Sequence, residues 1–170
     1  MLETGDLIFV RDGSDMGQAI QTSTGNYNHV AIYLDGMIYH ASEHAGVVCQ
    51  EPADFFESNH LYDIYVYPEL DIQSVKEKAC KHLGAPYNAS FYPDGIGFYC
   101  SQYMVEILPI FEAIPMKFGD GEQVISDFWR EYYREIGLPV PLNQAGTNPS
   151  QLAASPLLEC KERNLHDSDF

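Results

Sequence analysis

The sequence predicts an α+β fold in which an antiparallel sheet packs against helices. Up to Pro68, short segments alternate apolar and polar residues, the period of a half-buried strand, and turn residues separate them. From Asp71 onward the apolar residues recur every three or four positions, which is typical of amphipathic helices. A chain of 170 residues with 45% hydrophobic content can bury one large core, so we expect a single domain over residues 1–170.

The strands of the first half are short and are bounded by turn residues. One helix interrupts them at residues 14–25, where Ser14 or Asp15 can cap its start and Gly25 can end it. A short helical turn is expected in ADFFES. We expect strands in GDLIFVR (5–11), in both arms of a hairpin (28–42), in GVVCQEP (46–52) and in YDIYVYP (62–68).

The hairpin segment NHVAIYLDGMIYHAS (28–42) predicts its own register. Asp-Gly is typical of a two-residue type I′ turn, because both central residues of that turn need positive φ. A turn at Asp35 and Gly36 pairs the two residues that flank it. His29 and His40 then share one face of the hairpin as diagonal neighbours on adjacent strands, close enough to interact.

The second half is mainly helical. A helix is expected from residue 72, capped by Asp71 and ended near Gly84, and a loop rich in Pro, Gly and Asn follows it at 85–99. Further helices are expected just after Cys100 and after Ser126. Residues 138–170 contain four prolines in LPVPLNQAGTNPSQLAASP and have no clear period, so we expect an extended tail that wraps the domain and frays at KERNLHDSDF.

Charge narrows the range of partners. With 9 Lys and Arg against 25 Asp and Glu, the formal net charge is −16, which disfavours nucleic acid and an anionic membrane surface and is compatible with an amine-bearing ligand. No apolar run is long enough to span a membrane, and the N-terminus does not have the pattern of a signal peptide. We therefore expect a cytoplasmic protein with no stable membrane association.

The cysteines and histidines do not predict a metal site. The four cysteines form no C-x-x-C pair, so neither a disulfide framework nor a structural zinc site is expected. His40, His44 and Cys49 are spaced as ligands could be, but two histidines four residues apart point the same way only on a helix, and this segment is strand and turn. We expect no metal and no cofactor.

One cysteine stands where a nucleophile could be activated. Cys100 follows a glycine-containing loop and opens a predicted helix, whose dipole and free N–H groups would lower the pKa of the thiol. An imidazole and a third, orienting group would complete a catalytic set, and His29 and His40 could supply both. The alternative is that Cys100 is only a small buried residue and that each histidine only satisfies local hydrogen bonds.

The segment LGAPYNASFYPDGIGFYCSQYMVE (83–106), together with NHVAIYL (28–34), resembles the papain-like cysteine amidases of the NlpC class. Because His29 precedes Cys100, the order is similar to that of the circularly permuted branch, which includes YiiX-like hydrolases and relatives of lecithin:retinol acyltransferase. The opening TGDLIFVR and the closing GTNPSQLAASP also resemble YiiX-like members, so the resemblance covers nearly the whole chain. It implies a permuted papain-like, NlpC-type fold with an antiparallel, partly barrel-like sheet against helices.

The resemblance also implies roles for four residues. Cys100 matches the nucleophile, His29 the base, His40 the third polar residue, and Tyr87 the tyrosine beside the oxyanion site. The implied activity is that of a cysteine hydrolase that cleaves an amide through a thioester acyl-enzyme. The expected substrate is a small cell-wall peptide or peptidoglycan fragment with a γ-D-glutamyl bond to a diamino acid. Two alternatives stay open: a lipid-directed thiol acyltransferase or hydrolase, and a catalytically silent ligand-binding module of the same fold.

Overall fold

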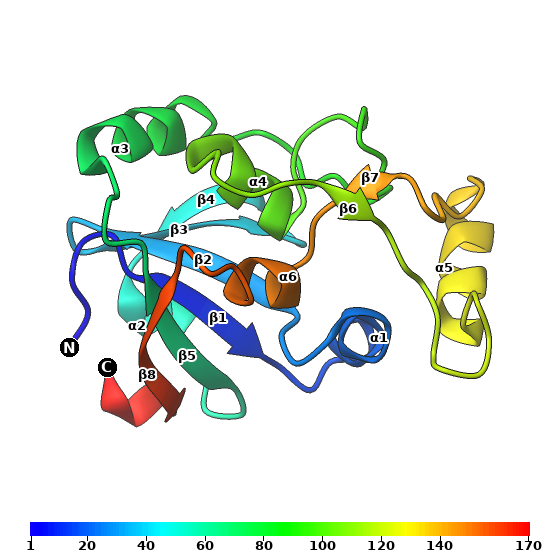
Figure 1. The fold of residues 1–170 in the computed structure, drawn as a ribbon, viewed down its shortest axis with the longest axis horizontal. Coiled ribbons are helices and arrows are strands. Elements are labelled where there is room, and N and C mark those ends of the chain that lie inside the picture. The colour runs from blue at the N-terminus through cyan, green and yellow to red at the C-terminus, as the bar shows by residue number, and fades with distance from the viewer.

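The computed structural model describes residues 1–170 and is built on a six-stranded antiparallel sheet (Figure 1). The strand order is β4-β3-β2-β1-β5-β8, and a two-stranded sheet of β6 and β7 lies apart from it. The predicted α+β class is therefore confirmed. The strands are β1 (Leu7–Arg11), β2 (His29–Leu34), β3 (Met37–Ser42), β4 (Gly46–Gln50), β5 (Leu61–Val66), β6 (Ile114–Pro115), β7 (Ala145–Gly146) and β8 (Glu159–Leu165).

The helices begin and end largely where the capping residues predict. Ser14, Asp71 and Ser126 each accept a hydrogen bond from a backbone N–H in the first turn of their helix, and Gly137 ends one helix in the left-handed conformation at φ 74°. None of the helices combines the length and the hydrophobicity that a membrane span requires. The helices are α1 (Asp15–Thr24), α2 (Pro52–Phe55), α3 (Ile72–Lys81), α4 (Cys100–Ile107), α5 (Asp127–Ile136), α6 (Pro149–Ala153) and a 3₁₀ turn (Asp167–Asp169).

The two faces of the sheet pack against different helices. Val30 and Ile32 belong to the larger core, to which α3, α4 and α6 contribute from one side of the sheet (Figure 1). Ala31 belongs to a smaller core on the opposite face, which α2 helps to cover through Phe55. Successive side chains of a strand point to opposite faces, so β2 divides the molecule into two environments.

A third apolar cluster lies at one end of the sheet. Trp129 and Tyr133 of α5 pack with Phe118 in its centre, and Ile20 of α1 and Phe91 pack against them. Figure 1 shows α1 and α5 together at that end, away from α3 and both chain termini. This cluster supplies the outer wall of a cavity described below.

The hairpin has the predicted register. Leu34 pairs with Met37, and the turn residues Asp35 and Gly36 have φ values of 49° and 89°, as a type I′ turn needs. This register places His29 and His40 on the same face.

The C-terminal segment differs from the prediction. KERNLHDSDF is not frayed: Glu159–Leu165 forms β8, which pairs with β5 at the edge of the main sheet, and Asp167–Asp169 forms the 3₁₀ turn. Most of β8 is exposed, so its sequence lacks the apolar alternation that identifies a strand.

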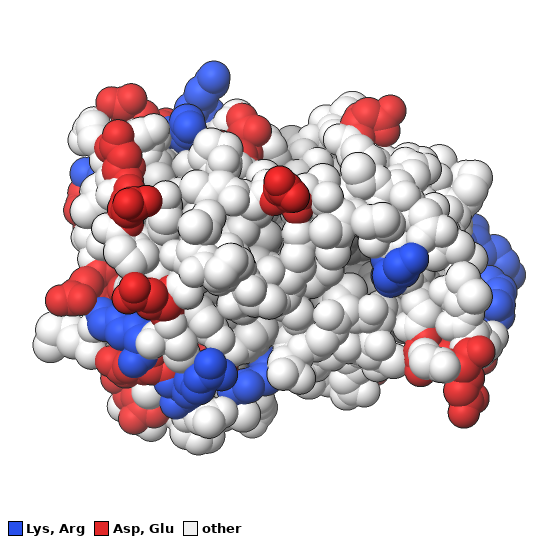
Figure 2. Space-filling model, viewed as in Figure 1, with Lys and Arg blue, Asp and Glu red and all other residues white.

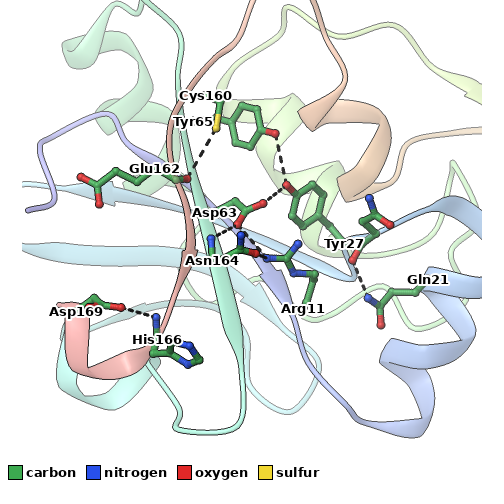
Figure 3. A network of polar contacts seen from close by, with 11 residues as sticks. Arg11, Gln21, Tyr27, Asp63, Tyr65, Cys160, Glu162, Asn164, His166 and Asp169 are labelled. Carbon is green, nitrogen blue, oxygen red and sulfur yellow. Dashed lines mark hydrogen bonds and ion pairs between the residues drawn. The ribbon is translucent and has the colours of Figure 1, made fainter.

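A buried carboxylate helps to fix β8 (Figure 3). Asp63 of β5 is 1% exposed and accepts hydrogen bonds from Arg11 Nη2 at 3.0 Å, from the backbone N–H of Asn164 at 2.7 Å and from the Tyr27 hydroxyl. Residues of β1, β5 and β8 therefore meet at the Asp63 carboxylate. Their ion pair and hydrogen bonds offset the free-energy cost of burying its charge. Because Tyr27 lies two residues before His29, this network also holds the chain where β2 begins.

Candidate active site

Cys100 is the first residue of α4 and is buried against β2. The backbone N–H groups of Val30, Ser101 and Cys100 itself are directed at its sulfur. The predicted helix-start position of the thiol is therefore confirmed. The contact with Val30 brings the sulfur to the strand end that carries His29.

The predicted lowering of the thiol pKa is wrong. Burial raises the pKa of Cys100 to about 12, although the three N–H groups favour the thiolate, and the negative charge of Asp12 acts in the same direction as burial. Removal of water from a charged sulfur outweighs a few favourable backbone dipoles when the group is enclosed. The resting thiol is therefore neutral at physiological pH.

His29 and His40 are brought together as the hairpin register predicts. His29 Nε2 lies 2.9 Å from His40 Nδ1, and the two rings are nearly perpendicular, with centroids 5.0 Å apart. The ring of Phe55 packs beside both. Burial is the main reason that the pKa of each imidazole lies below its usual value, and His40 and His60 lower that of His29 further. Both rings are therefore neutral at pH 7.

Gln50 is a site residue that sequence reasoning missed. Its side-chain oxygen accepts a hydrogen bond from His40 Nε2. The register of β3 with β4 explains the contact, because Gln50 pairs with Ile38 and so is a diagonal neighbour of His40. The sequence predicted a strand here, but no turn signal fixed its register, so Gln50 could not be placed.

The structure does not join the thiol to the imidazoles by a hydrogen bond. The side chain of Val30 points toward α4 and Cys100, whereas His29 packs with Phe55 on the other face. Asn28 lines a cavity that contains Cys100, and His29 lines a separate cleft. The start of β2 therefore lies between two differently lined spaces, with Cys100 on one side and His29 on the other.

The Cys100 pocket is the cavity between α4, α6 and the third apolar cluster. It is partly open to solvent. No acidic residue lines it, and Lys117 is its one charged residue. Its walls are mainly apolar and aromatic, with Ile20, Tyr87, Phe91, Met116, Phe118 and Trp129 among them.

Most of the polar side chains that line the Cys100 pocket are bonded within the protein. Asn28 bonds Asp12 and Gln21, and the hydroxyls of Ser101 and Thr147 bond each other at 3.0 Å. Lys117 Nζ donates to Asn143 at 2.6 Å. With these groups engaged, the pocket offers a ligand mainly apolar surface.

The histidine cleft is the second space and has the opposite character. His29, His40 and Gln50 lie in it beside His44 and His60. Its acidic residues are Asp12, Glu43, Asp54 and Glu57. No Lys or Arg lines it, so its surface favours a cation.

Tyr87 lies in the Cys100 pocket, where the resemblance predicts the oxyanion site. Its hydroxyl makes no hydrogen bond within the protein, and burial raises its pKa well above the usual value, so it remains a free donor. An isolated bridge between Tyr87 and Phe98 holds the loop, and Gly97 at φ 84° permits it, because a Cβ there would collide with the Pro86 oxygen.

These features define a class of protein: a buried thiol at a helix start, set against a sheet that carries two bonded histidines. The chain matches the family described as "Permuted papain-like amidase enzyme, YaeF/YiiX, C92 family" over residues 1–160, and it belongs to that family. It is a papain-like cysteine hydrolase of the amidase and peptidase type. No curated protein is a significant match.

The fold is shared with a solved structure. It is described as "metalloprotein yiiX from Escherichia coli O157:H7", is 21% identical, and aligns with a TM-score of 0.77 over 95% of this chain and 97% of that chain. The present chain has no group of three or more His, Cys, Asp or Glu side chains placed to hold a metal ion. Its residues as arranged therefore do not fit a metal centre.

Proposed function

We propose that Cys100 is the nucleophile and His29 the base of an amide hydrolysis that proceeds through a thioester. His29 takes the thiol proton as the sulfur attacks the carbonyl carbon, and the C–N bond then breaks as His29 returns that proton to the leaving nitrogen. Water adds to the thioester in the second half, again with His29 as base, and releases the acid and the thiol. Neutral Cys100 and neutral His29 are the starting states that this sequence needs.

The negative oxygen of the tetrahedral intermediate needs donors. The backbone N–H of Cys100 and the free hydroxyl of Tyr87 are the candidates, because both lie at the Cys100 pocket. His40 holds the His29 ring through its Nδ1 and supports the imidazolium that forms.

The Cys100 pocket and the histidine cleft suggest how the substrate is oriented. The leaving nitrogen must come within reach of His29, so the amine part of the substrate belongs in the histidine cleft. The acyl part stays on Cys100 and belongs in the Cys100 pocket. An acidic cleft suits an amine that carries a further positive charge, and an apolar pocket suits an apolar acyl group.

The apolar lining of the Cys100 pocket is the observation that supports our choice of substrate class. We infer an amide between an apolar acyl group and an amine-bearing leaving group. This differs from the expectation of a cell-wall peptide, because a γ-D-glutamyl acyl group carries a carboxylate and the pocket presents little polar surface.

A γ-D-glutamyl-diamino-acid peptide is the second candidate, and Lys117 favours it. This exposed cation at the Cys100 pocket could meet the α-carboxylate of the glutamyl group, while the acidic cleft takes the free amine. In either case the proposed partner is a small substrate and not nucleic acid, in keeping with the net charge of −16. A cytoplasmic location remains part of the proposal.

The test is a competition for Cys100. The protein is incubated with equal concentrations of an N-acyl diamine with an apolar acyl chain and a γ-D-glutamyl-diamino-acid peptide, quenched in acid, and analysed by peptide mass spectrometry. We expect the apolar acyl group on Cys100. A glutamyl adduct alone would establish the second candidate, and no adduct or product from either would favour a silent binding module. Cys160→Ser, at an exposed cysteine outside both spaces, is the matched control.

A further inference from the structure

We propose that Gln50 is a positioning residue that sets the tautomers of both histidines and thereby leaves the lone pair on His29 Nδ1, the atom that must receive the thiol proton. The inference rests on the proposed function for its catalytic meaning. Its structural content, the placement of two protons, can be measured without any substrate.

A chain of hydrogen bonds runs from Gln50 through His40 to His29. The Gln50 side-chain oxygen can only accept, so His40 Nε2 carries a proton. In neutral His40 the other ring nitrogen, Nδ1, is then an acceptor. His29 Nε2 lies 2.9 Å from that acceptor and must donate. Neutral His29 has one ring proton, so its Nδ1 is left free to act as a base.

The reverse arrangement would be inactive. If His40 Nε2 accepted a hydrogen bond, its proton would sit on Nδ1 and point at His29 Nε2. His29 would then hold its own proton on Nδ1, and that nitrogen could not accept one from Cys100. An imidazole in the wrong tautomer cannot act as the base even when its position is correct.

No other side chain bonds either ring in the structure. His40 is 7% exposed, and its two ring nitrogens bond only His29 and Gln50. The charged or titratable groups around the pair come from every neighbouring element and bond neither ring. They are Asp12, Glu43, His44, Asp54, Glu57, His60 and Tyr62.

The test uses nitrogen NMR of the full chain with labelled histidine, since the ¹⁵N shifts and long-range couplings identify which ring nitrogen carries the proton. In the wild-type protein, both His29 and His40 should carry the ring proton on Nε2 and have an unprotonated Nδ1. Gln50→Leu removes the acceptor and should yield mixed or inverted tautomers, with kcat/KM lower by about 10- to 100-fold at every pH. Gln73→Leu, on the outer side of α3, is the matched control and should change neither.

Gln50→Glu separates positioning from simple packing. A carboxylate still accepts from His40 Nε2 but favours the doubly protonated ring, which would donate from Nδ1 and force His29 into the inactive tautomer. Activity should therefore be lost at low pH and return toward the wild-type value as the pH rises above the raised pKa of His40. If Gln50 had only a structural role, the acidic limb of the pH–activity profile would not shift in this way.

The outcomes separate the two proposals. A wild-type spectrum with the proton of His29 on Nδ1, or a Gln50→Leu variant with unchanged shifts and activity, would overturn the role of Gln50. If the shifts are as expected but no amide is hydrolysed, the tautomer assignment stands and the proposed function fails.

Discussion

The Cys100 pocket and the histidine cleft lie on the two sides of the start of β2 and differ in almost every physical respect. The pocket is apolar, has bonded polar groups and carries one cation; the cleft is polar, carries four carboxylates and has no cation. In the proposed mechanism, the pocket holds the sulfur that keeps the acyl group, and the cleft holds the imidazoles that move the proton. In that mechanism the two linings would select the substrate by opposite criteria, one for each side of the amide.

The net charge of the whole chain does not predict the charge of the residues that line a site. The chain carries −16, yet no carboxylate lines the Cys100 pocket. Figure 2 shows charged residues mainly around the rim of one face, with a largely uncharged surface over α4 and α6. Acidic character is therefore local, and the cleft is one of the places where it gathers.

We expect the largest effect from replacing Cys100 or His29, and these variants test whether the thiol and the imidazole act in one step. Cys100→Ala and His29→Ala should each lower kcat/KM by at least about 10³-fold, and the double variant should be little worse than either, because groups that share one step are not additive. His40→Ala should retain more activity, since His40 orients the base and transfers no proton to the substrate. Steady-state kinetics of the four proteins measure this; an additive double variant would mean that thiol and imidazole work independently.

The next effect concerns the resting thiol. A pKa of about 12 for Cys100, against an ordinary thiol value of about 8.5, leaves far less thiolate at pH 7.5. We expect Cys100 to react with iodoacetamide at least about 100-fold more slowly than exposed Cys80 and Cys160, with a rate that keeps rising as the pH increases. Peptide mass spectrometry over time measures each rate. Labelling of Cys100 before the exposed cysteines would mean that the helix start lowers the thiol pKa more than burial raises it.

A smaller effect separates the acyl candidates. Met116→Gln places an amide in the wall of the Cys100 pocket and should lower kcat/KM for an apolar acyl substrate by about tenfold, with less effect on an acetyl amide of the same amine. Lys117→Met, at the adjacent residue, removes the one charge that lines the pocket and should impair only a glutamyl substrate. If Met116→Gln affects both acyl groups equally, the apolar lining does not select the substrate.

The smallest effect is expected in the histidine cleft. Asp54 is exposed, so its attraction for a cationic leaving group is screened by water and salt. Asp54→Asn should raise KM for a diamine amide by about two- to fivefold at low salt, less at high salt, and leave a neutral amine amide unchanged. Asp127→Asn on α5, outside the cleft, is the control. Equal effects on charged and neutral amines would remove the electrostatic reason for placing the amine there.

Local rules predicted the parts of the site that neighbouring residues build. The Asp-Gly turn fixed the register that brings His29 and His40 together, and capping residues located α1, α3 and α5. The strand β8 escaped prediction because exposed polar residues form it and only pairing with β5 stabilises it. Gln50 escaped because its contact depends on a register that no turn dipeptide specifies.

Four features could be predicted without the structure: the α+β class, the family resemblance, the paired histidines and the cysteine at the start of a helix. Each of these depends on residues a few positions apart or on a continuous motif. Three others depend on the folded chain: the direction of the Cys100 pKa shift, the bond from His40 to Gln50 and the opposite linings of the two spaces. The pKa of a thiol depends on how much water surrounds it, and the walls that exclude that water come from α1, α5 and the loop at Phe91. Residues so far apart in the chain meet only when the domain folds.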